Sequence, residues 1–197
     1  MKNIYLITII LTLFSCNAQI IIPMNSNLVP FTSGAYYSDT DFELNKYIGK
    51  WKYENGNESF TIVLQKILNQ QHNGYSQDIL VGEYKYVDAT GVTIVNTLPM
   101  MDATLSSPLY HKIKGANILY RLQYPKCLEC ADDEFRVDSN IDDPERDYVS
   151  SKIVFRWMSP TQIKVKIYST GSPLSPAIES PTTIRVPNEI EYVLNKI

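Results

Sequence analysis

The fold is decided by two neighbouring segments, Tyr47-Ile48-Gly49-Lys50-Trp51-Lys52-Tyr53 and Ser59-Phe60-Thr61-Ile62-Val63-Leu64-Gln65-Lys66. In the first segment, Trp51 and Tyr53 alternate with Lys50 and Lys52, so the aromatic and charged side chains fall on opposite faces of an extended chain. This alternation is typical of a half-buried β-strand. We therefore expect the two segments to form the opening hairpin of a β-barrel or β-sandwich.

Six further segments have the character of strands. The clearest pair is joined only by Ser159-Pro160-Thr161, which is typical of a hairpin. Gly82 marks a bulge or a close approach of two strands, and the one helix that the sequence supports is a short turn over residues 41–47. These features predict an all-β domain, an antiparallel barrel or strongly curved sandwich of about eight strands. The six segments are 78–87, 92–98, 116–124, 152–158, 162–168 and 189–195.

Residues 1–15 are predicted to be a lipoprotein signal peptide. Lys2 precedes an almost wholly apolar run that ends at Phe14, and this run is too short to span a bilayer, which needs roughly 20 apolar residues. The stretch Leu13-Phe14-Ser15-Cys16 resembles a bacterial lipobox, in which the cysteine becomes the new N-terminus and carries the lipid. We expect Cys16 to be lipidated. The alternative is ordinary secretion with cleavage before Gln19.

The rest of the chain divides into a tether and one domain. Residues 16–40 mix Asn, Ser, Thr, Pro and Gly without a sustained period, which predicts a tether from the lipid. Residues 41–197 have the length of a single barrel-like domain. The lipid on Cys16 would hold this domain at a membrane of the cell envelope, on the periplasmic side of the outer membrane, and without the lipid the protein would be secreted. Nucleic acid is not an expected partner, because the formal net charge is −3.

Cys127 and Cys130 form a C-x-x-C pair with three competing interpretations. A redox motif would need the first cysteine at the start of a helix in a βαβ unit, and none is visible. A zinc site would need two more ligands, and the sequence has only two isolated histidines. Outside the cytoplasm the pair is free to oxidise. We therefore favour a structural disulfide that pins a local turn, with two free thiols as a further alternative.

The sequence carries no common catalytic signature. Zinc-peptidase, serine-hydrolase and nucleotide-binding motifs are missing, and His111 is expected at a surface strand end. The acidic stretch 129–147 contains a D-x-N-x-D pattern from Asp138, but Asp143 stands where a calcium loop needs glycine. We therefore predict a solvated acidic loop, no metal, no cofactor and no enzymatic activity.

The triplet Gly49-Lys50-Trp51 resembles the G-x-W signature in the first strand of lipocalin-type barrels. More of the chain resembles an uncharacterised family of small secreted or lipid-anchored proteins from flavobacteria and their relatives, of the Bacteroidota. The shared blocks are Ser15 to Gln19, Leu44 to Trp51, a strand with an alternation of Phe, Ile and Leu, and the closing segment Pro181 to Pro187. This resemblance implies a lipocalin-like fold and an envelope location, and it assigns no catalytic residue.

The chain contains 14 tyrosines, and several of them occupy inward-facing strand positions. Such residues could line a pocket that stacks on a ligand and offers hydroxyl groups, or they could pack the core. The leading hypothesis is a lipid-anchored envelope protein that holds a small, partly apolar ligand inside the barrel. The alternative is an interaction module without a pocket, which meets another protein through strand edges or the loops at 99–115 and 125–150. The ligand-pocket candidates are Trp51, Tyr53, Tyr84, Tyr86, Tyr120 and Trp157.

Overall fold

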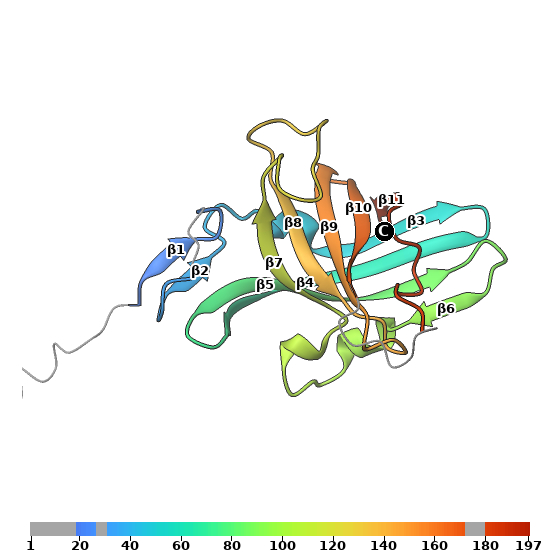
Figure 1. Cartoon of the computed structure of the whole chain (residues 1–197), viewed down its shortest axis with the longest axis horizontal. Coiled ribbons are helices and arrows are strands. Elements are labelled where there is room, and N and C mark those ends of the chain that lie inside the picture. Colours follow the sequence, from blue (N-terminus) through green and yellow to red (C-terminus); the bar gives the residue numbers. More distant parts are fainter. Residues whose placement is uncertain (1–18, 27–30, 172–179) are drawn as a thin grey trace, which may run out of the picture.

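A computed structural model of the chain describes residues 19–26, 31–171 and 180–197 (Figure 1). These residues form a single 11-stranded sheet with three short 3-10 helices, and none of them belongs to an α-helix. The predicted signal peptide and Cys16 lie outside the described residues.

Eight strands close into an antiparallel barrel. Each barrel strand pairs with the next barrel strand along the chain, and the last strand pairs with the first. The prediction of an all-β, lipocalin-like barrel of about eight strands is therefore confirmed. The barrel strands are β3 (Gly49–Asn55), β4 (Glu58–Gln71), β5 (Ser76–Val87), β7 (Ile113–Leu119), β8 (Arg136–Ile141), β9 (Ser150–Ser159), β10 (Gln162–Gly171) and β11 (Glu191–Lys196).

The opening hairpin has the register that the alternation predicted. Trp51 of β3 lies opposite Ile62 of β4, and Ile62 lies opposite Tyr84 of β5, so the three side chains form one inward-facing row. At Gly82 the two strands come close, since a Cβ atom there would lie 2.3 Å from the Val63 carbonyl oxygen. Glycine at this position is required by the close approach of the backbone.

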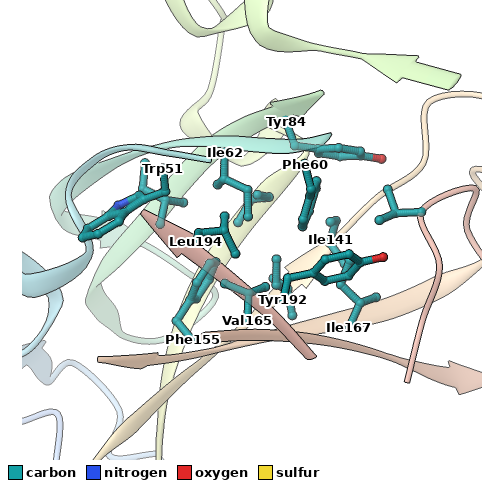
Figure 2. Close-up of a cluster of buried hydrophobic side chains, with 14 of the residues drawn as sticks. Trp51, Phe60, Ile62, Tyr84, Ile141, Phe155, Val165, Ile167, Tyr192 and Leu194 are labelled. Atoms are coloured by element: carbon teal, nitrogen blue, oxygen red, sulfur yellow. The ribbon is translucent and has the colours of Figure 1, made fainter. Parts of the chain in front are cut away.

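Aromatic and branched side chains fill the barrel interior (Figure 2). They come from strands far apart in the sequence, and each large one is almost completely removed from solvent, which contributes roughly 1.5–3 kcal/mol per side chain. The Phe60 ring lies 5.2 Å from the Tyr192 ring and 6.2 Å from the Tyr84 ring, between centroids. The largest of these side chains are Trp51, Tyr47, Tyr84, Tyr192, Phe60 and Phe155.

One end of the barrel is closed by the 3-10 helix η1 (Leu44–Tyr47). The Asp39 carboxylate accepts hydrogen bonds from the backbone N–H groups of Glu43, at 2.8 Å, and Leu44, at 3.1 Å. It also pairs with Lys66 of β4 at 2.7 Å. A short helical turn here was predicted, and the Asp39 carboxylate satisfies two N–H groups at its start.

The other end is covered by the chain before β11. Ile184 and Val186 are buried in the core there. Arg185, between them, forms a two-pronged ion pair with Asp143, with Nη2 and Oδ1 2.8 Å apart, and donates to the Ile94 carbonyl oxygen at 3.1 Å. Besides η1 and the two N-terminal strands, three short elements lie outside the barrel strands, namely β6 (Thr93–Asn96), η2 (Leu98–Asp102) and η3 (Pro108–Tyr110).

The N-terminal residues belong to the sheet. β1 (Ile21–Pro23) pairs in parallel with β2 (Tyr36–Ser38), and β2 pairs in parallel with the start of β5. Buried Asp78 of β5 accepts hydrogen bonds from the Tyr36 hydroxyl at 2.6 Å and the Asp39 backbone N–H at 2.9 Å. Residues 16–40 were predicted to be a tether. The described part of this stretch instead pairs with the sheet and is held by Asp78, about 40 residues further along the chain than Ser38.

Two barrel strands differ from the prediction. β8 lies inside the stretch 125–150, which was expected to be a loop, because its outward Arg136, Asp138 and Asn140 conceal the alternation with its inward side chains. β7 ends at Leu119, before most of the predicted segment 116–124, after a register shift between Lys114 and Asn117.

Candidate functional site

The predicted pocket residues Trp51, Tyr84 and Tyr86 lie in the core and fill the interior. Burial raises the pKa of Tyr84, so its hydroxyl stays protonated and donates a hydrogen bond. The polar atoms of all three already have partners inside the protein. Trp51 Nε1 donates to the Tyr47 carbonyl at 2.7 Å, the Tyr84 hydroxyl to the Asp142 carbonyl at 2.9 Å, and the Tyr86 hydroxyl to the Glu58 carboxylate at 2.8 Å.

The other three predicted pocket residues lie elsewhere. Tyr53 and Trp157 are half-buried and pack against the core, Tyr53 against the Tyr192 ring at 5.1 Å between centroids. Tyr120 lies beyond the end of β7, outside the barrel strands, and its hydroxyl donates to the Asn25 carbonyl. The structure therefore does not bring the six predicted residues into one pocket. The sequence correctly predicted which strand side chains point into the barrel, but these side chains pack the interior and do not line a pocket.

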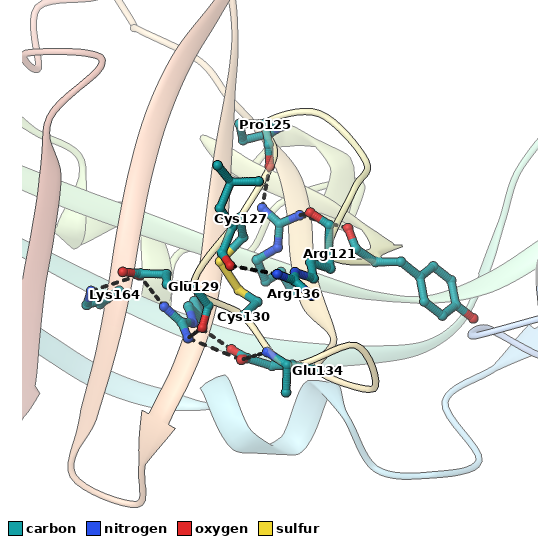
Figure 3. The surroundings of a disulfide bond; sticks show 12 residues. Arg121, Pro125, Cys127, Glu129, Cys130, Glu134, Arg136 and Lys164 are labelled. Atoms are coloured by element: carbon teal, nitrogen blue, oxygen red, sulfur yellow. Dashed lines mark hydrogen bonds and ion pairs between the residues drawn. A yellow bond between two sulfur atoms is a disulfide. The ribbon is translucent and has the colours of Figure 1, made fainter.

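The chain between β7 and β8, residues 120–135, is here called the disulfide loop (Figure 3). Cys127 and Cys130 form a disulfide in it, with their Cα atoms 5.4 Å apart. Arg121 reaches across the loop to the Leu128 carbonyl at 2.9 Å and to Asp132 at 2.6 Å. These bonds fold the loop on itself.

Ion pairs attach the loop to the outer faces of β9 and β10 (Figure 3). Arg156 of β9 contacts both Glu129 and Glu134, and Lys164 of β10 lies 3.2 Å from Glu129 and 2.8 Å from Glu191. Hydrogen bonding to Lys164 lowers the pKa of Glu129, and hydrogen bonding to Glu134 raises the pKa of Arg156. Glu129 and Arg156 are therefore both charged at neutral pH.

Arg136, the first residue of β8, also holds the disulfide loop against the barrel. Its side chain is buried, and its guanidinium donates to the backbone carbonyl oxygens of Tyr120 at 2.8 Å, Gln123 at 3.1 Å and Pro125. Desolvation by burial lowers the pKa of Arg136. A guanidinium with several donors is well suited to collect carbonyl groups in this way.

A hollow of about 360 Å³ lies between the disulfide loop and the outer faces of β8, β9 and β10, and is here called the groove. The loop exposes three apolar side chains, Leu122, Tyr124 and Leu128, each of them about 70 % accessible, and Leu128 lines the groove. An apolar group this exposed is available for contact with a partner. The groove is lined by Pro125, Lys126, Leu128, Val154, Lys166 and Glu191, with Arg136 and the ion pairs at its wall.

The sequence reasoning missed the groove. The outward positions of Lys164 and Lys166 follow from the alternation in β10, and the same parity places Arg156 outward on β9. The pattern within single segments does not predict that the disulfide loop folds back over these side chains.

The acidic stretch 129–147 was predicted to be a solvated loop, and this prediction is wrong for part of it. Asp138 and Asp143 are buried, and each is paired, Asp138 with Lys152 at 2.8 Å and Asp143 with Arg185. Although burial alone raises the pKa of Asp143, hydrogen bonds from Arg185 lower it overall. Among the described residues no group of three or more Cys, His, Asp or Glu side chains is arranged to hold a metal ion.

His111 also differs from its predicted surface position. It is buried, and its Nδ1 atom lies 2.9 Å from Oε1 of the fully buried Glu83. The backbone N–H of Lys112 approaches the same Glu83 oxygen at 3.3 Å. The pair of His111 and Glu83 fastens the end of the segment with η2 and η3 to the outer face of β5. This structural role explains why both side chains are buried.

Within the described part of the chain, no helix has the length and apolar character needed to cross a membrane. No curated protein and no solved structure matches the chain at a significant level. The sequence does match a family of unknown function (DUF6705), and the match extends over residues 1–197. The chain therefore belongs to this family of unknown function.

Proposed function

We propose that this is a non-enzymatic, exported protein of the bacterial cell envelope, anchored through a lipid on Cys16, in a member of the Bacteroidota. In this proposal it binds its partner on the outside of a filled, lipocalin-like barrel. The partner-binding face comprises the disulfide loop and the groove beneath it. The alternative that the sequence favoured, a small ligand inside the barrel, would require interior side chains to leave their packed positions.

The observation that carries this proposal is the packed interior. Trp51, Phe60 and Tyr84 are each 0 % exposed, and both barrel ends are covered. Native cores of this kind are close-packed, so a ligand could enter only by displacing side chains. Three exposed apolar side chains, Leu122, Tyr124 and Leu128, lie on the disulfide loop, which the ion pairs and Arg136 hold in one position. A rigid, partly apolar surface is suited to binding a partner.

The lipid anchor is supported by the lipobox-like stretch at Leu13 to Cys16. Gln19 already contacts the domain, since its side-chain amide lies 3.3 Å from the Ser76 hydroxyl. Three residues of extended chain span at most about 10 Å. A lipid on Cys16 would therefore hold the barrel close to the membrane surface, without the longer tether that the sequence had suggested.

Two measurements test the lipid anchor and the absence of a ligand inside the filled barrel. Native mass spectrometry of the protein from its own host should show the acylated chain without a further bound molecule. Cys16→Ser should release the protein from the membrane fraction. An additional stoichiometric mass that is lost on unfolding and is retained in the groove variant Lys126→Gln would restore the internal-ligand hypothesis.

The binding face is tested by site-specific photo-crosslinking in the native host. A photoreactive residue in place of Leu128, on the disulfide loop, should give a discrete adduct. The same residue in place of Leu68, which is 64 % exposed on β4, is the matched control and should give none. Equal labelling from both positions would reject the disulfide loop as the binding face.

A further inference from the structure

Two cationic side chains that line the groove have no carboxylate partner among the described residues. Arg136 is only 3 % exposed, yet its guanidinium forms hydrogen bonds with backbone carbonyl oxygens alone, although the Glu134 carboxylate is near enough to interact with it electrostatically without forming an ion pair. Its Nε–H group is buried without a hydrogen-bond partner there. Lys126, on the disulfide loop, is exposed and likewise forms no ion pair within the described chain. A buried cation and a buried unbonded donor are each costly, so an anion in the groove would be stabilised.

The other charges around the groove restrict what this anion can be. Arg156 and Lys164 are already neutralised by Glu129 and Glu191, and these two carboxylates line the groove themselves. Their negative charge opposes a ligand group that carries two charges, because like charges at short range repel. The charge balance therefore favours a singly charged anion.

Apart from Lys166, which pairs with Glu189 at 3.0 Å, the remaining wall of the groove is apolar. Val154 contributes from β9, and Leu128, Pro125 and Cys127 contribute from the disulfide loop. Leu128 is 74 % exposed, so an apolar chain lying against it would remove its surface from water. A volume of about 360 Å³ is at the small end of the range for ligand sites.

We propose that the groove binds one carboxylate group carried on a short apolar chain, with the carboxylate at Arg136 and Lys126 and the chain along Val154 and Leu128. This inference rests on the proposed function, because it names the chemistry that the exterior binding face accepts. Two sources have that chemistry: the C-terminus of a partner protein that ends in an apolar residue, and a free small carboxylic acid.

The test is an NMR titration of the isotope-labelled, folded protein with hexanoate, and with hexanamide as its uncharged counterpart. Hexanoate should shift the Leu128 and Val154 signals in a saturable manner at millimolar concentration, and hexanamide should bind at least five-fold more weakly. Lys126→Gln should weaken hexanoate binding at least three-fold. Lys85→Gln, on β5 across the barrel from β10, is the matched control and should leave binding unchanged.

A peptide that ends in Val-Leu distinguishes the two sources when its free and amidated forms are compared. Tighter binding of the free peptide than of hexanoate supports a protein C-terminus, and equal binding supports a free acid. Equal shifts from hexanoate and hexanamide, or hexanoate shifts away from the groove, overturn the inference. If crosslinking at Leu128 succeeds while hexanoate shifts nothing, the carboxylate assignment fails and the proposed function stands.

Discussion

The ammonium group of Lys196 lies 5.1 Å from the centroid of the Trp51 ring. The two residues are paired neighbours on β11 and β3, where the last barrel strand meets the first. Trp51 is fully buried, so its ring provides a fixed surface for the cation. This contact therefore lies on the seam at which the barrel closes.

Removing the charge at this seam should have a measurable cost. Lys196→Met keeps most of the apolar stem and removes the ammonium group, so we expect a loss of about 0.5–1 kcal/mol in the free energy of unfolding. Urea denaturation measures this loss. Lys50→Met, at an exposed neighbouring position, is the control and should be close to neutral. Equal stability of the two variants would show that the cation contributes nothing to closure.

The close approach at Gly82 provides a second prediction. In Gly82→Ala the new Cβ would lie 2.3 Å from the Val63 carbonyl oxygen and 2.7 Å from Leu64 Cδ2, so β4 and β5 must separate. We expect a loss of about 3 kcal/mol or a failure to fold, comparable to the larger overpacking effects. Gly56→Ala, in open space with φ +60°, should cost only about 1 kcal/mol. Similar losses for both would mean that contact with β4 does not restrict Gly82.

The sequence predicted the parts of this fold that local alternation determines. The barrel class, the inward parity of Trp51 and Tyr84 and the hairpin of β9 and β10 all follow from patterns a few residues long. Whether the interior is hollow or filled depends on the combined volume of side chains from eight strands, which no single segment shows. The attachment of β2 to Asp78 and the position of the disulfide loop are likewise contacts between distant residues.

The buried pair of Arg185 and Asp143 should make stability depend on pH. Because the folded protein depresses the pKa of Asp143, the stabilisation is present above the ordinary carboxyl pKa and is lost as the pH falls through the lower, folded value. Arg185→Met leaves a buried, unpaired carboxylate and should cost about 3–5 kcal/mol at pH 7. Protonation of Asp143 relieves part of this cost, so the difference from wild type should narrow by pH 3.

Urea denaturation at both pH values measures this difference. Lys52→Met is the control, because its partner Glu54 is 65 % exposed and such pairs contribute about 0–1 kcal/mol. A pH-independent deficit in Arg185→Met would show that Asp143 is not the titrating partner.

The Asp78 side chain should stabilise the N-terminal strands β1 and β2 more than it stabilises the barrel. The Asp78 carboxylate accepts hydrogen bonds from the Tyr36 hydroxyl and the Asp39 backbone N–H, and Asp78→Asn removes its charge. We expect a loss of about 1–3 kcal/mol in the free energy of unfolding. Hydrogen exchange should increase in residues 35–39 and remain unchanged in β9 and β10. Asp41→Asn, at an exposed position, is the control. An equal increase throughout the barrel would contradict a local role for Asp78.

The disulfide should stabilise its own loop without being needed to dock it. Cys127 and Cys130 are three positions apart, so the closed loop is short and the chain-entropy estimate is about 2 kcal/mol. The carbonyl bonds from Arg136 and the ion pairs of Arg156 do not depend on the sulfur atoms. In the double variant Cys127→Ser and Cys130→Ser, hydrogen exchange should rise within residues 121–134 while β8 and β9 stay protected. Exchange that also rises in β8 would show that the disulfide, rather than Arg136, holds the loop on the barrel.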